Sequence, residues 1–365
     1  MNNQKLYEIA LTLVPGVGIV NGKKLVAYCG GAEAVFCEKK KALTKINGVS
    51  ENVIKSLDSK EVMKKAEKEI EFVLKNGITP LFYLDQDYPK RLQHCHDSPL
   101  MLYYKGNADL NTQKVVGVVG TRNITDYGRY VTEKIIEDLS ADNVLIISGL
   151  AYGVDSVAHR AALKYNLATV GVLGHGMQII YPAENRKLST NMLEKGGILT
   201  EFVSGTQPDR ENFPKRNRIV AGMIDCLIVI ESALKGGAMI TADIANSYDR
   251  EVFAIPGKIG DIYSEGCNQL IKTNKANLIN SAADIRYVMR WDIDTKVVAK
   301  QMRMFRDFSE DEKKVMDVFD NNSIVHLDDI IVGTDLSPSK IASVLLSLEF
   351  DGVLTALPGK RYQKL

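Results

Sequence analysis

The sequence predicts an α/β protein built around a doubly wound, parallel, Rossmann-like sheet. Between residues 114 and 279, short apolar runs rich in β-branched residues alternate with stretches of helical periodicity. The runs are apolar at successive positions, which is typical of strands buried on both faces of a sheet. Repeats of strand, helix and strand form right-handed crossovers, so these strands should be parallel.

The elements of this core follow from the same pattern. The predicted strands are 114–119, 144–148, 168–173, 226–231 and 251–255, with weaker candidates at 197–200 and 276–279. The predicted helices between them are 126–139, 155–165, 184–195, 214–223 and 237–248. A short strand is also expected at 78–84, followed by a segment that packs on the core. We therefore place the core domain at 76–290.

Residues 1–75 should form a separate helical domain, with helices at 5–13, from 19 to Tyr28, at 51–57 and at 60–75. The turn Leu13-Val14-Pro15-Gly16-Val17-Gly18 resembles the helix-hairpin-helix motif of SAM-like domains, with a weaker second copy at 46–50. In that motif the glycines let backbone amides approach a phosphate. A tight turn between packed helices explains the same residues, and both interpretations stay open.

The C-terminal part is predicted to be a winged-helix domain at 307–365, joined to the core by a linker at 291–306. A charged helix containing Trp291 should precede the linker. Ser309 and Glu312 have the spacing of a capping box, and a terminal hairpin ends the chain. The presumed recognition helix is nearly all apolar after Lys340, which favours protein contact over reading of the major groove.

Composition narrows the class of protein. A chain of 365 residues suggests two or three domains, and the formal net charge of +1 means that any polyanion site is a local basic patch. Five widely spaced cysteines without a Cys-x-x-Cys pair argue against a disulfide framework or zinc ribbon. Without a signal-peptide or membrane-spanning apolar run, we expect a cytoplasmic protein. His94 and His96 have no distant partner in the sequence, so no metal site is expected.

The loops after the predicted strands carry glycines and cations. In an open parallel sheet, ligands bind at the carboxyl ends of the strands, where these loops converge. The cations on this edge are Arg122, Arg186, Lys187, Lys215, Arg216, Arg218 and Lys235. The pattern predicts an anion site.

Several common anion sites are excluded. The glycines after the first strand lack dinucleotide-fingerprint spacing, and Ser148-Gly149 stands where an acidic residue should follow the second strand. The chain has neither a Gly-Lys-Ser/Thr phosphate loop nor a Gly-x-Ser-x-Gly elbow. His159 and His175 are candidate acid–base groups, although His159 is expected to be structural because its helix faces the sheet.

The stretch from Phe213 to Ala221 favours one kind of anion. It places Lys215, Arg216 and Arg218 beside an aromatic ring, ahead of an apolar run that enters the core. Cations neutralise phosphates, and a ring can stack on an unpaired base. The segment alone would also fit a solvated helix start, but its place among the other loops favours single-stranded nucleic acid.

These segments together resemble the family of the DNA-processing protein DprA, also called Smf. The resemblance covers roughly residues 77–280. Its motifs are Tyr88-Pro89, 98–106, Gly120-Thr121-Arg122, 148–159, Gly174-x-Gly176, 181–185, Phe213-Pro214-x-Arg216-Asn217-Arg218-Ile219, Ile255-Pro256-Gly257 and 266–271.

The resemblance implies a homodimeric, non-enzymatic protein that binds single-stranded DNA, with no cofactor and no metal. It implies protection of incoming DNA in natural transformation and help in loading the RecA recombinase. The DNA-binding residues carried over from the family are Gly120, Thr121, Arg122, Lys187, Phe213, Lys215, Arg216 and Arg218. Arg186 and Arg218 are also candidates for structural ion pairs. The loop Ala233–Ala238 has Leu-Lys where the family has smaller, more polar residues, so its role stays open.

Two other functions fit the same fold class. The first is a nucleoside-monophosphate phosphoribohydrolase, whose Pro-Gly-Gly-x-Gly-Thr-x-x-Glu loop carries a catalytic glutamate. The matching segment here, 235–243, has no glutamate at that place. The second is a nucleotide-sensing module, which would bind a mononucleotide tightly without DNA.

Overall fold

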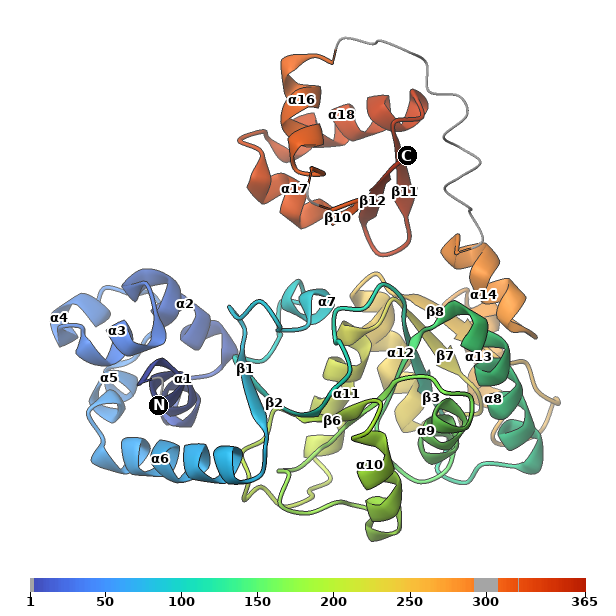
Figure 1. Cartoon of the computed structure of the whole chain (residues 1–365), viewed down its shortest axis with the longest axis horizontal. Helices are drawn as coiled ribbons and strands as arrows, with labels where there is room; N and C mark the ends of the chain where they lie inside the picture. Colours follow the sequence, from blue (N-terminus) through green and yellow to red (C-terminus); the bar gives the residue numbers. More distant parts are fainter. Residues whose placement is uncertain (1–2, 292–307, 321) are drawn as a thin grey trace.

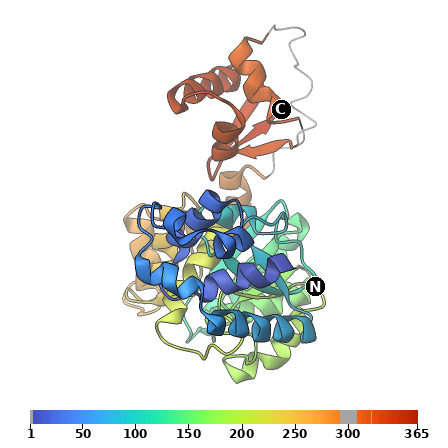
Figure 2. The ribbon, with the colours of Figure 1, turned by 90° about the vertical axis from the view of Figure 1, so that its left-hand side faces the viewer.

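The computed structural model describes residues 3–291, 308–320 and 322–365. Figure 1 shows a helical N-terminal part at one end, a large sheet flanked by helices, and a small C-terminal unit set against the core. Figure 2 views the same ribbon from the side of the N-terminal helices. The predicted linker, 291–306, lies almost entirely outside the described residues.

The N-terminal part packs its helices around one apolar cluster that includes Leu11, Leu25 and Ile70. Its helices are α1 (Asn3–Leu13), α2 (Ile19–Cys29), α3 (Ala32–Cys37), α4 (Lys40–Leu43), α5 (Glu51–Leu57) and α6 (Lys60–Lys75). Gly16 and Gly48 lie in the two predicted turns with φ of 82° and 91°, a backbone conformation that favours glycine. The four predicted helices are present, and the short α3 and α4 are additions.

The core is a sheet whose strands are, in spatial order, β1-β2-β6-β5-β4-β3-β7-β8-β9. Their bounds are β1 Thr79–Phe82, β2 Met101–Gly106, β3 Val115–Val119, β4 Leu145–Ser148, β5 Thr169–Val172, β6 Gly197–Thr200, β7 Cys226–Val229, β8 Glu251–Ala254 and β9 Asn277–Leu278. From β6 to β9 every pairing is parallel, as predicted. The sheet is mixed, however, because β1 pairs with β2, and β2 with β6, in antiparallel register.

Helices cover both faces of the sheet, which confirms the doubly wound α/β fold. One face packs against α11 (Asn212–Met223), α12 (Gly237–Ser247) and α13 (Glu265–Lys272). The other packs against α8 (Asp126–Leu139), α9 (Val154–Lys164) and α14 (Ala282–Met289). Two short helices complete the core: α7 (Lys90–Gln93) lies between β1 and β2, and α10 (Arg186–Met192) contacts β6.

The end of the core differs from one prediction. Helix α14 stops at Met289, and Arg290 takes a left-handed conformation with φ of 55°. Trp291 therefore follows the helix rather than lying within it. The left-handed conformation of Arg290 turns the chain out of the helix, and the Trp291 amide closes the turn by donating to the Arg286 carbonyl at 2.9 Å.

The C-terminal unit has the predicted winged-helix elements. They are α16 (Glu310–Asp317), β10 (Ile324–His326), α17 (Leu327–Gly333), α18 (Pro338–Phe350), β11 (Leu354–Leu357) and β12 (Arg361–Lys364). The capping box formed by Ser309 and Glu312 is present at the start of α16. Helix α18 buries Ile341 and Leu345 in the unit's own core, while Phe350 is exposed.

No single helix in the described part of the chain is long and apolar enough to cross a membrane. The pair α17 and α18 meets the test together by length and composition, with a bend of 116° between its members.

Candidate nucleic-acid interface

A groove of about 300 Å³ opens at the carboxyl ends of β3, β4 and β7. The chain runs outward from β3 through β4 to β6 in one direction and from β7 to β9 in the other. The groove therefore lies at the point where the strand order reverses, which is where open α/β sheets bind ligands. Its lining includes Gly120, Thr121, Arg122, Gly149, Asp155, Phe213, Arg216, Asn217, Ser232, Gly236 and Gly237.

The loop after β3 forms one wall and is held by backbone contacts on both sides. The Thr121 amide donates to the Glu231 carbonyl at 2.7 Å, and the Val154 amide donates to the Thr121 carbonyl at 3.2 Å. A Cβ on Gly120 would lie 2.4 Å from Val154 Cγ2. Gly153 has φ of 72°, and a Cβ there would lie 2.2 Å from the Thr121 oxygen. Only glycine lets the two loops approach this closely.

Glu231 anchors the far end of the same loop. Its buried carboxylate accepts from the Thr125 amide at 3.0 Å and from the Thr125 hydroxyl. The Thr125 hydroxyl also accepts from the Gly128 amide at 3.0 Å and so caps α8. Glu231 thus holds the loop at Thr121 through its backbone and at Thr125 through its side chain. Sequence reasoning assigned it no role.

An aromatic and cationic cluster lines the opposite part of the groove and a neighbouring hollow. The guanidinium carbon of the exposed Arg122 lies 5.5 Å from the Phe213 ring centroid, a cation–π geometry. The Phe213 and Tyr181 ring centroids are 6.0 Å apart. Tyr152 lines the same hollow and donates from its hydroxyl to Glu184 at 2.8 Å.

Sequence reasoning missed Tyr152 and Tyr181 as members of this cluster. Both rings are substantially exposed, at 42% and 46%. The available signal was their place in two loops that follow neighbouring strands, since Tyr152 comes after β4 and Tyr181 after β5. Exposed aromatic rings beside a basic groove are the residues on which bases stack.

Arg216 lies beneath this surface rather than on it. It is 5% exposed, and its Nη1 donates to the carbonyls of Gly149 at 2.5 Å and Val172 at 2.6 Å. Burial lowers the pKa of its guanidinium, and the Asp155 carboxylate opposes that shift. The Arg216 side chain therefore links the loop after β4 to the end of β5. Its positive charge lies at the bottom of the groove.

Arg218 is engaged in the structural ion pair that the sequence allowed for. Its Nη2 contacts the Glu201 carboxylate, and its Nη1 donates to the Asp97 carbonyl at 2.7 Å. Lys187 and Lys215 are exposed on the first turns of α10 and α11. Of the eight predicted DNA-binding residues, five line the groove: Gly120, Thr121, Arg122, Phe213 and Arg216. The other three, Lys187, Lys215 and Arg218, lie outside the lining of the described groove.

The two candidate acid–base histidines form hydrogen bonds within the fold. His159 is fully buried, its Nδ1 lies 2.7 Å from the Thr169 hydroxyl, and burial lowers its pKa to about 3. His175 places Nδ1 2.9 Å from the Gly176 carbonyl, and its Nε2 accepts from the Tyr181 amide at 3.3 Å. Burial lowers the pKa of His175 as well. Both rings are therefore neutral near pH 7.

Two protein-family models match this chain. Residues 79–290 match the model of DNA recombination-mediator protein A, and residues 306–360 match the DprA winged helix domain. The chain belongs to the DprA (Smf) family. Protein Smf of Synechocystis sp. is 31% identical over 410 residues, which cover 100% of this chain and 99% of that protein. DNA processing protein DprA of Streptococcus pneumoniae is 41% identical over 55% of this chain and 71% of its own length.

Solved DprA structures have the same fold. The X-ray structure of DprA from Streptococcus pneumoniae matches with a TM-score of 0.62 and 30% identity, covering 77% of this chain and 97% of that one. DprA from Helicobacter pylori matches with a TM-score of 0.54 and 29% identity, covering 59% of this chain and 96% of that one. The latter structure concerns the single-stranded DNA binding mode of that protein. DprA relatives are thus DNA-processing proteins, and one of them binds single-stranded DNA.

Proposed function

We propose that this chain binds single-stranded DNA in the groove at the carboxyl ends of β3, β4 and β7. The observation that carries the proposal is the placement of Arg122 over the Phe213 ring at the groove wall. A cation there meets a phosphate while the neighbouring rings of Tyr181 and Tyr152 offer faces to bases. Membership of a family in which a relative binds single-stranded DNA supports it.

The chemistry favours unpaired strands without sequence preference. Stacking requires a base that is free of its partner strand, and any base has a face that can stack. Arg122, Lys187 and Lys215 serve the phosphates. The Thr121 hydroxyl, beside Gly120 in the groove lining, adds a donor, because the Thr121 amide already donates to the Glu231 carbonyl. Arg216 and Arg218 act by holding the walls of the groove, because one is buried and the other is paired with Glu201.

The wider role follows from the family. We propose a cytoplasmic homodimer, formed through the core domain, that protects incoming DNA in natural transformation and helps load RecA for recombination. Within it, residues 1–75, 76–290 and 307–365 act as helical, DNA-binding and winged-helix domains, with 291–306 as linker. The core exposes apolar side chains that a dimer could cover, such as Ile259 at 94% and Ile262 at 65%.

The competing enzyme function is less well supported. The helix after β7 begins with Gly237-Ala238, and the segment 235–243 has no glutamate at the catalytic place of phosphoribohydrolases. His175 uses both ring nitrogens in hydrogen bonds with the backbone. We therefore propose a binding protein without catalytic activity and without a cofactor.

Fluorescence anisotropy tests the proposal. Labelled oligo-dT and a matched duplex are titrated with wild type, with Arg122→Ala and with Arg160→Ala, which removes an exposed arginine of α9 outside the groove lining. We expect tighter binding of oligo-dT than of duplex, weakened in Arg122→Ala and unchanged in Arg160→Ala. Equal binding of both DNAs, or equal loss in both variants, contradicts the site. Release of base from nucleoside monophosphates would instead support the enzyme.

A further inference from the structure

The winged-helix unit contacts the core at the amino ends of the strands, opposite the groove. Lys360 pairs with Asp249 at 2.7 Å, and Arg361 pairs with Asp225 at 2.8 Å. Asp249 and Asp225 come just before β8 and β7. Arg290 of the core donates to the Ala356 carbonyl at 2.9 Å. The tip of the β11–β12 hairpin is therefore fixed on the core by charge.

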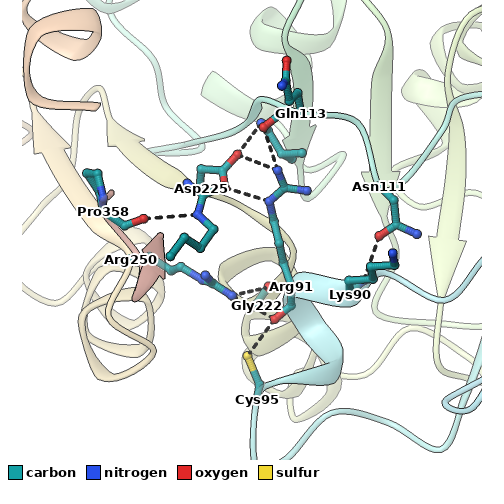
Figure 3. A network of polar contacts seen from close by, with 11 residues as sticks. Lys90, Arg91, Cys95, Asn111, Gln113, Gly222, Asp225, Arg250 and Pro358 are labelled. Carbon is teal, nitrogen blue, oxygen red and sulfur yellow. Dashed lines mark hydrogen bonds and ion pairs between the residues drawn. The ribbon is translucent and has the colours of Figure 1, made fainter. Parts of the chain in front are cut away.

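Asp225 is the centre of this contact. Its carboxylate receives Arg91 from the core through two hydrogen bonds of 2.7 and 2.9 Å, as Figure 3 shows. Arg361 approaches the same carboxylate from the winged-helix unit. Pro358, near the hairpin tip, lies beside this network (Figure 3), and the Arg361 Nε donates to its carbonyl at 3.2 Å.

Next to this contact, the two parts of the chain bring together nitrogen and oxygen ligands. His94 follows α7 in the core, and His326 ends β10 in the winged-helix unit. Their rings stack with centroids 4.1 Å apart. The Asp328 Oδ2 lies 3.9 Å from His94 Nδ1 and 3.6 Å from His326 Nδ1, and the Asp329 Oδ2 lies 3.7 Å from His94 Nε2.

These separations suit a shared ion better than hydrogen bonds. They exceed the 2.7–3.2 Å range of N–H···O bonds. Around a tetrahedral zinc ion with bonds near 2.0–2.1 Å, neighbouring ligand atoms lie about 3.3 Å apart. One ligand atom from each of His94, His326 and Asp328 already lies within 4.8 Å of the others. Shifts of a few tenths of an ångström to about 1.5 Å, within the reach of side-chain rotation, complete the set.

We propose that His94, His326 and Asp328 form a binding site for a divalent transition metal, with zinc as the expected ion, that fastens the winged-helix unit to the core. Two imidazoles and a carboxylate are a ligand set that zinc accepts. Asp329 approaches the other ring nitrogen of His94, Nε2, so a water molecule suits the fourth position better. His326 Nδ1 already accepts the Asp328 amide at 3.2 Å, which leaves Nε2 as the free ligand atom of that ring.

The local structure makes the three ligands available without unfolding either part. The side chains of His94 and His326 are 19% and 13% exposed, and that of Asp328 is 55% exposed. An ion can thus enter from solvent on the Asp328 side. The two rings, stacked in the structure, then turn so that one nitrogen of each points at the ion. The sequence predicted no metal site because His94 has no partner nearby in the chain, whereas the winged-helix unit brings His326 beside it.

Cobalt titration of the whole chain tests the site. Metal-free protein is titrated with Co²⁺, followed by its visible absorption, and Zn²⁺ is then added as a competitor. We expect one equivalent to bind, displaced by zinc. His94→Ala and His326→Ala should each weaken binding by more than about tenfold, since each removes a ligand. His96→Ala, an exposed neighbour of His94, is the matched control and should bind as wild type.

Further variants keep the test decisive. Asp328→Asn changes an exposed side chain, so a loss of binding in that variant cannot be attributed to misfolding. Zn²⁺ should raise the Tm of wild type and of His96→Ala but not of His94→Ala. Cys37→Ser removes an exposed thiol that could bind cobalt. Binding that needs Cys37, that survives loss of either His94 or His326, or that is absent from wild type overturns the proposal.

Discussion

The Arg122 guanidinium carbon lies 5.5 Å from the centroid of the Phe213 ring, so the loop after β3 meets the first turn of α11 across the groove. Gly174 makes room for this ring, because a Cβ there would lie 2.9 Å from Phe213 Cδ1. The proposed phosphate-binding cation and stacking ring thereby lie side by side, one on the loop after β3 and the other on the first turn of α11.

Phe213→Ala should weaken binding of every single-stranded sequence by about 1–3 kcal/mol, because one stacking face is lost. The dependence of affinity on salt should stay unchanged, since no charge is removed. Anisotropy at several salt concentrations measures both quantities. If the variant unfolds at a lower urea concentration than wild type but binds DNA normally, the Phe213 ring contributes only to the stability of the core.

Glu231→Ala should destabilise the chain by roughly 1–3 kcal/mol, because the Thr125 amide and hydroxyl lose their buried acceptor. The loop at Thr121 should loosen as well, so the affinity for oligo-dT should fall without a change in charge at the groove surface. Urea unfolding and anisotropy provide the two readouts. Glu194→Ala, which alters an exposed carboxylate outside the groove lining, is the control. Wild-type stability in Glu231→Ala would remove the anchoring role.

Gly153→Ala should destabilise the chain by about 1–3 kcal/mol, because it combines a positive φ with a Cβ 2.2 Å from the Thr121 oxygen. Gly205→Ala is the matched control, since a Cβ there meets nothing within 4 Å. Thermal unfolding compares the two variants. Equal Tm values would mean that the loops are not pressed together at Gly153.

Asp225→Asn should lower the free energy of unfolding by roughly 3–5 kcal/mol at pH 7, because Arg91 and Arg361 lose their shared counter-ion. Burial raises the pKa of Asp225, but Arg91 and Arg361 outweigh it, and the pKa is lowered overall. A lowered pKa contributes stability that is present above the unfolded value near 3.9 and is lost as pH falls through the folded value. The difference between wild type and variant should therefore shrink below about pH 4. A constant difference in urea unfolding from pH 7 to pH 3 contradicts this assignment.

The parallel core and its helices could be predicted because buried strands and amphipathic helices leave different periodicities. The capping box at Ser309 is likewise a local signal. The antiparallel edge could not be predicted, because the pairing of β2 with β6 depends on where the N-terminal part meets the sheet. Trp291 was assigned to a helix because the pattern of α14 contains no proline or glycine to mark its end at Met289.

The loops that form the groove could be predicted from the sequence. Which of their cationic side chains face the groove could not. Arg216 and Arg218 differ from Lys215 only through partners on other elements, namely the carbonyls of Gly149 and Val172 and the carboxylate of Glu201. The approach of His326 to His94 depends in the same way on how the winged-helix unit lies on the core.

The salt dependence of oligo-dT binding by Arg122→Ala tests the central claim most directly, with Arg160→Ala as the control. If Arg122 contacts a phosphate, the plot of log affinity against log salt should become shallower by about 0.7–1 unit for Arg122→Ala only. Parallel plots for wild type and both variants would contradict the claim and place the DNA away from this groove.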